Sequence, residues 1–272
     1  MYRNLFVVFS FLLLSSCYGD IDKNISTDLQ IEGNEVFNIS LVLDESLIFA
    51  FDSFEDYRKA DTTSVLGCPN ILIDETEKKV TLEFMGNRQC VNENNLSRTG
   101  KIHVRFINES SFTSTILEYD GYTVRGNKIS GKREFIKRRM SNGFNNTPMV
   151  ETFENFLIID EKGSSSQLKG DFEHRTLSLN NISTEIVSNG SLEGRNITGR
   201  PILMNRNQPK RYSITCLKGG FVIPSSGSET WQVVRHTNQA TSHQLIFESE
   251  AACQNLATIT LHDGRTIQYR QL

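Results

Sequence analysis

Val80-Thr81-Leu82-Glu83-Phe84 and Ile102-His103-Val104-Arg105-Phe106 are the two stretches that decide the fold of this chain. In both, apolar and polar residues alternate, which is typical of a β-strand with one face in a core and the other in solvent. Short turns follow, and their Asn-Gly and Asp-Gly pairs favour hairpins. Further strands are predicted at 115–125, 128–138, 151–159, 167–177, 183–187, 197–203, 211–215, 230–235, 244–248, 257–261 and 266–269. The sequence predicts a mainly β fold, an antiparallel meander forming a large twisted sheet or an open barrel or sandwich.

The region before these strands divides into a polar stretch and an apolar one. Residues 17–34 contain too few apolar side chains to pack, which predicts a tether. Residues 35–66 are predicted to be helical, because Leu41, Glu45, Ile48 and Phe49 fall on one helical face, which ends near Tyr57. One all-β domain is expected to follow at 67–272.

The first residues have the pattern of a signal peptide, predicted to span 1–16. Arg3 is followed by an unbroken apolar run from Leu5 to Leu14 and then by two serines and Cys17. A spanning helix needs roughly 20 apolar residues, about twice the length of this run. The sequence therefore predicts export without a transmembrane helix.

Leu14-Ser15-Ser16-Cys17 resembles a bacterial lipobox. The resemblance implies that Cys17 receives a diacylglycerol, gains a further acyl chain such as palmitate, and becomes the mature N-terminus. Two or more acyl chains hold a protein stably on a membrane. The expected location is the cell envelope, at the outer membrane, on either its periplasmic or its surface face. The alternative is an ordinary secretory signal with an incidental cysteine.

Four further cysteines form an even set in a chain expected to be exported, where disulfides persist. We predict the pairs Cys68 with Cys90 and Cys216 with Cys253, because each closes a short loop. Each pair also brackets a similar succession of an apolar stretch, a turn and strands, as if the two ends were related modules. A zinc site is the alternative, but no two thiols have the close spacing of zinc ligands.

The charge balance of 29 basic against 32 acidic residues gives no strong field, so a nucleic-acid partner is not predicted. One local basic cluster stands out. It is interpreted as a solvated strand face, with contact to anionic sugars or lipid headgroups as the alternative, and comprises Lys132, Arg133, Lys137, Arg138 and Arg139.

Motifs for chemistry are missing from the sequence. There is no G-x-S-x-G nucleophile turn and no H-E-x-x-H pair, so neither a catalytic residue nor a metal ligand is predicted, and no cofactor. A glycosidase needs two facing carboxylates, which the sequence alone does not identify. The histidines are expected at the surface: His103, His174, His236, His243 and His262.

Several aromatic residues are candidates for a binding surface. Rings on strands can stack on sugars, although packing in the core is their commoner role. The candidates are Trp231, Tyr119 and Tyr122, together with Phe153 and Phe156.

Motifs at both ends of the chain resemble a group of uncharacterised envelope lipoproteins of the Bacteroidota. They are Cys68-Pro69, Thr81-Leu82-Glu83-Phe84, Gly86, Cys90, Arg98-Thr99-Gly100-Lys101-Ile102, Tyr212-Ser213-Ile214-Thr215, Cys253-Gln254-Asn255, Ala257-Thr258-Ile259-Thr260 and Asp263-Gly264. The stretch 91–95 departs from the glycine-rich turn of that group. The resemblance implies export, anchoring and β architecture, and no activity.

These observations predict a non-enzymatic, lipid-anchored envelope protein whose β scaffold serves binding or structure. The expected partners are the membrane, through the N-terminal lipid, and a glycan or an envelope protein. Two alternatives stay open, a carrier of an apolar ligand and a hydrolase without a recognisable motif.

Overall fold

The computed structural model describes residues 21–86, 96–139, 147–180, 182–236 and 239–270. Thirteen strands form one sheet in which every strand pairs antiparallel with its neighbours in sequence. The sheet is open, because β1 and β13 are its two ends and do not pair with each other. The predicted antiparallel meander is confirmed.

The strands are short at the two ends of the sheet and long in the middle. Their bounds are β1 Asn70–Asp74, β2 Lys79–Met85, β3 Arg98–Asn108, β4 Phe112–Val124, β5 Asn127–Arg138, β6 Met149–Ile159, β7 Ser165–Leu179, β8 Ile182–Arg195, β9 Pro201–Ser213, β10 Ser226–His236, β11 Gln239–Ala251, β12 Gln254–Thr260 and β13 Thr266–Arg270.

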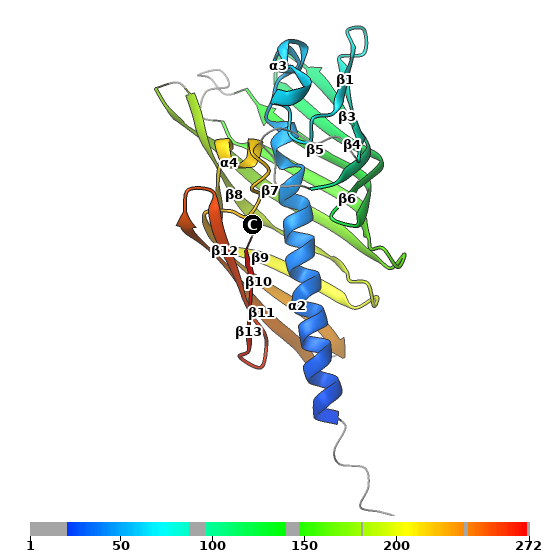
Figure 1. Ribbon diagram of the computed structural model, residues 1–272, viewed down its shortest axis with the longest axis vertical. Helices are drawn as coiled ribbons and strands as arrows, with labels where there is room; N and C mark the ends of the chain where they lie inside the picture. Colours follow the sequence, from blue (N-terminus) through cyan, green and yellow to red (C-terminus); the bar gives the residue numbers. More distant parts are fainter. Residues whose placement is uncertain (1–20, 87–95, 140–146, 181, 237–238, 271–272) are drawn as a thin grey trace, which may run out of the picture.

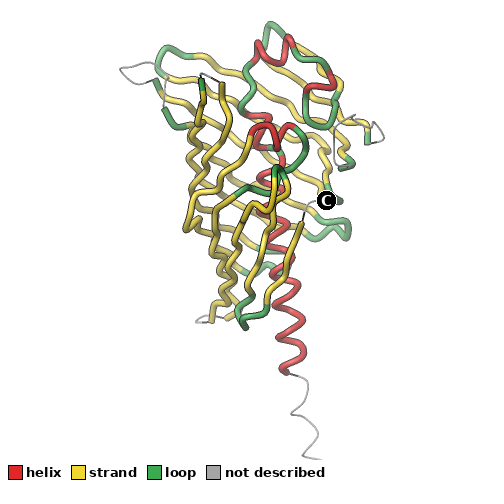
Figure 2. The backbone as a smooth tube through the Cα atoms, turned by 60° about the vertical axis from the view of Figure 1, so that its left-hand side comes forward, coloured by secondary structure: helices red, strands yellow, loops and turns green. Residues whose placement is uncertain are grey.

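Helix α2 (Ile21–Glu45) lies along one face of the sheet, which curves around it (Figures 1 and 2). Its contacts reach from Arg98 of β3, which pairs with Glu45, to Tyr269 of β13, which hydrogen-bonds Asn34. We call this face of the sheet the inner face and the opposite one the outer face. The helix starts at Ile21, so the predicted boundary at residue 34 between tether and helix is wrong.

The prediction of one helical face that runs on to Tyr57 is wrong, because the chain after α2 does not continue as a single helix. A 3-10 turn η1 (Leu47–Ala50) follows, and then the short helix α3 (Phe54–Lys59). Ser53 and Asp56 form a capping box at the start of α3, which satisfies the free backbone N–H groups there. The N-cap Ser53 therefore begins a new helix within the segment that the helical periodicity had predicted to be continuous.

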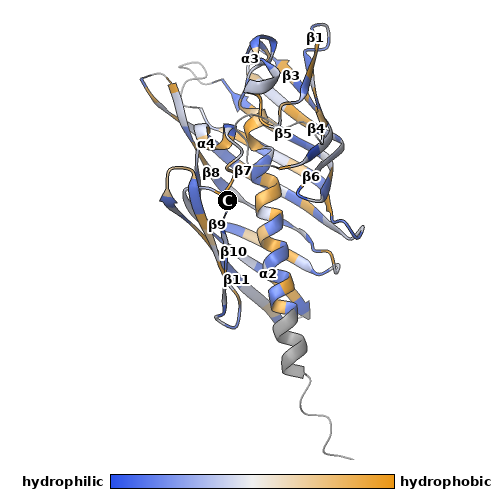
Figure 3. Cartoon of the chain, viewed as in Figure 1, coloured by the Kyte–Doolittle hydropathy of each residue, from blue (hydrophilic) through white to orange (hydrophobic). Residues whose placement is uncertain are grey.

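Apolar side chains of α2 and of the inner face form the core. Every residue from Ile39 to Ala50 is buried, while Gln30, Ile31 and Asn34 near the start of the helix are exposed. At Gly33 an added Cβ would lie 2.5 Å from Leu261 Cδ2, so the helix packs closely on the end of β12. Figure 3 shows that hydrophilic residues also occur along the packed helix. Three of its carboxylates, Glu32, Asp44 and Glu45, form ion pairs with cations outside the helix.

Two predicted strands, 197–203 and 211–215, are wrong in their bounds. Residues 201–203 of the first and 211–213 of the second belong to the single strand β9. Residues 197–200 precede β9 in a turn, and Ile214 and Thr215 lie in helix α4 (Ile214–Lys218). The pairing of β9 with β8 shifts register between Ser188 and Ser191. A bulge of this kind adds residues without ending a strand, which breaks the alternation that marks a strand in sequence.

The disulfide between Cys216 and Cys253 is confirmed, with an S–S distance of 2.04 Å. Cys68 is also disulfide-bonded. Its predicted partner Cys90 lies outside the described residues. Within the described part of the chain, no helix has the length and apolar character needed to cross a membrane.

Candidate functional site

Five residues form a sealed group of charges between α2 and strands β9 and β10, which we call the Asp44 cluster: Asp44, Arg206, Lys210, Tyr212 and Glu229. Lys210 Nζ lies 2.8 Å from Asp44 Oδ2 and 2.7 Å from Glu229 Oε1. Tyr212 OH donates to Asp44 Oδ1 at 2.7 Å, and Arg206 lies 3.4 Å from Glu229. The side chains of Lys210 and Glu229 have 0% exposure, so each charge is compensated by its neighbours and not by water.

The alternation of β9 explains how these side chains reach the helix. Met204, Arg206, Lys210 and Tyr212 all occupy inward positions, and two of those positions carry a cation where a core residue would be expected. Gly227 of β10 makes room for Lys210, because a Cβ there would lie 2.8 Å from the Lys210 Cα. Burial alone would raise the pKa of Glu229, but the charges of Lys210 and Arg206 outweigh it and lower that pKa.

The Arg133 cluster joins the end of α2 to strands β4 to β7 and comprises Arg133, Glu151, His174, Tyr119 and Ser46. Arg133 Nη1 donates to Ser46 Oγ at 2.8 Å, and its Nε lies 2.5 Å from Glu151 Oε1. His174 Nε2 lies 2.8 Å from Glu151 Oε2. Burial would raise the pKa of Glu151, yet the Arg133 charge and the His174 hydrogen bond lower it to about 2. This group also leaves no room for a substrate, since the Arg133, Glu151 and His174 side chains are all at most 3% exposed.

The Glu32 cluster, near the start of α2, is more open and comprises Glu32, Arg200, Arg235, Thr241 and His243. Glu32 lies 2.7 Å from Arg200 Nη1, 3.0 Å from Arg235 Nη2 and 3.3 Å from His243 Nε2. Its pKa is lowered to about 2, because hydrogen bonds from His243 and Arg235 outweigh the effect of burial. The Arg200 side chain is 32% exposed. Water therefore reaches this cluster from one side.

Taken together, the three clusters fasten α2 to the sheet and do not form an accessible reaction centre. A buried charge that loses its partner is strongly destabilising, so each pair constrains the position of the helix. The helix supplies carboxylates at Glu32, Asp44 and Glu45, and the sheet supplies most of the cations.

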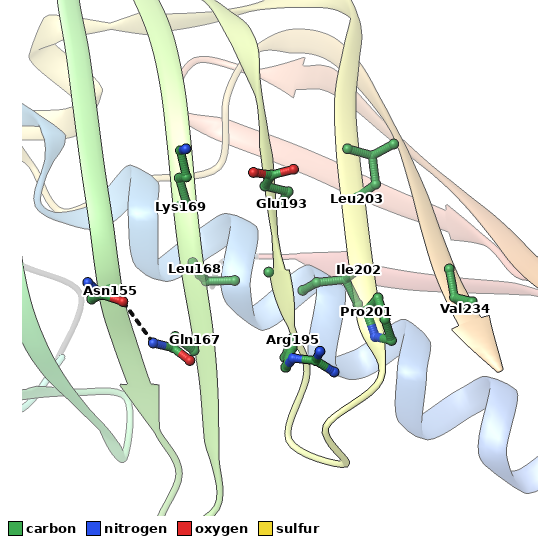
Figure 4. A pocket seen from close by; sticks show the side chains of 11 residues that line it. Asn155, Gln167, Leu168, Lys169, Glu193, Arg195, Pro201, Ile202, Leu203 and Val234 are labelled. Atoms are coloured by element: carbon green, nitrogen blue, oxygen red, sulfur yellow. Dashed lines mark hydrogen bonds between the residues drawn. The ribbon is translucent and has the colours of Figure 1, made fainter. Parts of the chain in front are cut away.

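A groove of about 480 Å³ lies on the outer face across strands β7 to β10 (Figure 4). One row of side chains along it comprises Gln167, Arg195 and Pro201, and the other comprises Lys169, Glu193 and Leu203. Leu168 and Ile202, in the row between, are buried toward the helix, so their backbone forms the floor.

The groove has one polar and one apolar end. Gln167 Nε2 donates to Asn155 Oδ1 at 2.9 Å, and Lys169 lies 3.4 Å from Glu154. At the other end Leu203 is 38% exposed and Val234 is 36% exposed. Glu193 stands between them and makes no hydrogen bond or ion pair with any described residue. The groove thus offers an apolar wall beside Glu193, a carboxylate that forms no ion pair with a described residue and has Lys169 as its cross-strand neighbour.

The aromatic candidates of the sequence lie elsewhere. Trp231 and Tyr122 have 0% exposure and Tyr119 is 6% exposed, and all three belong to the core beneath α2 together with Phe153 and Phe156. Packing in the core, the commoner role, is what the structure shows for these rings, and the candidate sugar-stacking surface is wrong because they face the helix and not solvent. Trp231 Nε1 donates to Glu229 Oε2 at 3.0 Å, so it supports the Asp44 cluster.

The histidines divide between core and surface. His174 and His243 are buried, against the expectation of a surface position, whereas His103 is half-buried and His262 exposed. The side chain of His236 lies outside the described residues. Arg133, expected on a solvated face, is buried. In the described ranges no group of three or more His, Cys, Asp or Glu residues is placed to hold a metal ion.

Sequence reasoning missed the Asp44 cluster. The signal in the sequence was a charged residue at a position where the strand alternation calls for an apolar one. Arg206, two positions after the buried Met204 in β9, is an example. The predicted anchor Cys17 lies outside the described residues and stays a prediction. In comparisons with known proteins, no family model, no curated protein and no solved structure matches the chain.

Proposed function

We propose that this chain is a non-enzymatic, lipid-anchored protein of the cell envelope, at the outer membrane, whose sheet presents its outer face to an envelope protein. The observation that carries the proposal is the difference between the two faces of the sheet. The inner face is filled by α2 and fastened to it by buried charges, whereas the outer face holds the open groove.

The position of α2 supports the anchoring part of the proposal. The helix begins at Ile21, four positions after Cys17, and runs about 37 Å at 1.5 Å per residue. A lipid on Cys17 would therefore be attached close to α2, which is held in the core. A force on the lipid anchor would be transmitted through α2 to the whole sheet.

The chemistry of the groove favours a protein segment as partner. None of its described lining residues is aromatic, so it lacks the rings on which sugars stack. Leu203 and Val234 suit an aliphatic side chain, and Glu193 suits a basic group next to it. The partner segment would carry a lysine or arginine beside an apolar residue.

The two alternative functions find less support in this arrangement. A carrier would use a large apolar pocket of roughly 300 to 1,000 Å³. The hollow between α2 and the inner face, lined by Ile31, Ile39 and Ile158 among others, measures about 230 Å³. A hydrolase would use titratable groups that a substrate can touch. The two carboxyls with the most lowered pKa are both held by cations, since Glu151 is sealed beside Arg133 and the Glu32 side chain is only 4% exposed beside Arg200 and Arg235.

Anchoring is tested with Cys17→Ser. We expect the variant to remain unprocessed or to carry no labelled palmitate, because the thiol is the acceptor. The wild-type chain serves as the control. Incorporation of label into Cys17→Ser would contradict the anchor assignment.

Partner binding is tested in cells by photo-crosslinking from position 203 in the groove, with the exposed position 244 on β11 as the matched control. We expect a discrete protein adduct from position 203 that disappears with Glu193→Lys, since the reversed charge repels a basic partner. Equal labelling from positions 203 and 244, or persistence of the adduct in Glu193→Lys, would contradict the groove as the binding site.

A further inference from the structure

A second hollow, of about 150 Å³, lies on the outer face over strands β2 to β5. Register places two rows of side chains around it. Lys79, Arg105 and Ile116 are successive cross-strand partners in one row, and His103, Glu118 and Lys132 are successive partners in the other. All six line the hollow.

The charge in this hollow is unbalanced. Three of the lining side chains are permanent cations, and one, Glu118, is a carboxylate. Lys79 forms an ion pair with Glu77 at 3.3 Å. Neither Arg105 nor Lys132 forms an ion pair with a described residue. On the neighbouring part of β2 and β3, by contrast, Lys101 is compensated by Glu83 at 3.2 Å.

The orientation of His103 adds a further polar group to the hollow. Its Nδ1 lies 2.9 Å from Oγ1 of Thr81, its cross-strand partner on β2, and this hydrogen bond fixes the position of the ring. Ile116 supplies an apolar side to the hollow. A guanidinium and an ammonium set around a small space favour an anion with several oxygens, because Arg pairs with oxyanions through parallel hydrogen bonds and Lys through a point charge.

We propose that this hollow binds a phosphoryl or sulfate group, free or carried by a sugar, through Arg105, Lys132 and Lys79. A membrane source is disfavoured by position, a point that rests on the proposed anchoring. The hollow lies on β2 to β5, the strands that meet the Glu45 end of α2, whereas the anchor would lie beyond the opposite end of that helix (Figure 1). The site is separate from the groove of β7 to β10, so each proposal can fail without the other.

The experiment titrates the full chain with inorganic phosphate and inorganic sulfate, and follows backbone amide resonances by NMR at low ionic strength. We expect saturable shifts centred on β2 to β5. Arg105→Gln combined with Lys132→Gln should weaken binding by about tenfold or more, since hydrogen bonds to charged groups are among the stronger ones. The matched control is Lys128→Gln, which removes an exposed cation of β5 that does not line the hollow, and it should bind as the wild type does.

A second variant tests the sign of the effect. Glu118→Gln removes the carboxylate among the lining residues and should tighten phosphate binding severalfold. Weaker or unchanged binding in Glu118→Gln, equal losses in Lys128→Gln and the double variant, or shifts spread evenly over the sheet would overturn the site.

Two further arms identify the source of the oxyanion. A sugar phosphate and a sugar sulfate should compete with inorganic phosphate at the same resonances. Vesicles containing anionic phospholipid should not bind through Arg105 and Lys132, and vesicle binding that the double variant abolishes, with no response to the soluble anions, would overturn the assignment.

Discussion

The Asp44 cluster and the Glu32 cluster both join a carboxylate of α2 to cations of the sheet, but water reaches them to different extents. In the first, Lys210 and Glu229 have 0% exposure, whereas in the second Arg200 is 32% exposed. The number of polar contacts is similar in the two. The difference teaches that burial, more than the count of ion pairs, decides how firmly each end of α2 is held.

The largest effect is expected for Lys210→Met, which removes the nearer of the two cations that Asp44 and Glu229 share and leaves only Arg206, at 3.6 Å from Asp44 and 3.4 Å from Glu229. Removing one partner of a buried ion pair costs about 3 to 5 kcal/mol of the free energy of unfolding. Urea denaturation followed by circular dichroism measures it. The matched control is Arg211→Met at the next position, where an exposed pair with Glu185 should contribute about 1 kcal/mol or less. Equal losses in the two variants would contradict the comparison.

The disulfide acts at the sealed end, because Cys216 lies in α4 directly after the strand that carries Lys210 and Tyr212. Its cysteines are 37 positions apart. Replacing both by serine should lower the free energy of unfolding by roughly 3 to 4 kcal/mol in the chain-entropy description. Non-reducing peptide mapping checks the pairing itself. A peptide that joins Cys216 to Cys68 or Cys90 would refute both this prediction and the related-modules interpretation.

Acid should weaken both ends of the helix. The pKa of Glu32 and that of Glu151 are each lowered from 4.5 to about 2, so their stabilisation is fully present above about pH 4.5 and is lost as the pH falls toward 2. Glu35 has the opposite sign, since burial raises its pKa. Urea midpoints measured between pH 6 and 2.5 should fall, and should fall less steeply in Glu32→Gln. An unchanged slope in that variant would contradict the role of Glu32.

The smallest effect is expected for Arg200→Gln in the Glu32 cluster. Arg235 and His243 remain beside the carboxylate, and water can replace the lost group, so the change in the free energy of unfolding should be about 1 kcal/mol or less. Thermal denaturation measures it. A loss as large as that of Lys210→Met would show that the two clusters are equally sealed.

Alternation was enough to predict the meander, because the apolar members of the pattern, such as Val80 and Leu82 in β2 and Ile102 and Val104 in β3, are buried in the core. It was not enough for β9, where a bulge and buried cations interrupt the pattern. It also missed the start of α2, since polar residues at positions such as Glu32 are typical of a tether until the sheet supplies their partners. The outer hollows depend on which residues the register brings together across strands, and this cannot be read from one strand alone.

The order of the chain makes the packed helix the first described element to be synthesised and one of the last to find its place. Asp44 contacts Lys210, which is synthesised 166 positions later, and Glu32 contacts His243, which is synthesised 211 positions later. Contacts of such long separation slow folding, because a long loop must close before they form. Until β11 exists, the acidic helix has no complete docking surface, so a chain truncated before that strand should expose apolar surface and depend on chaperones.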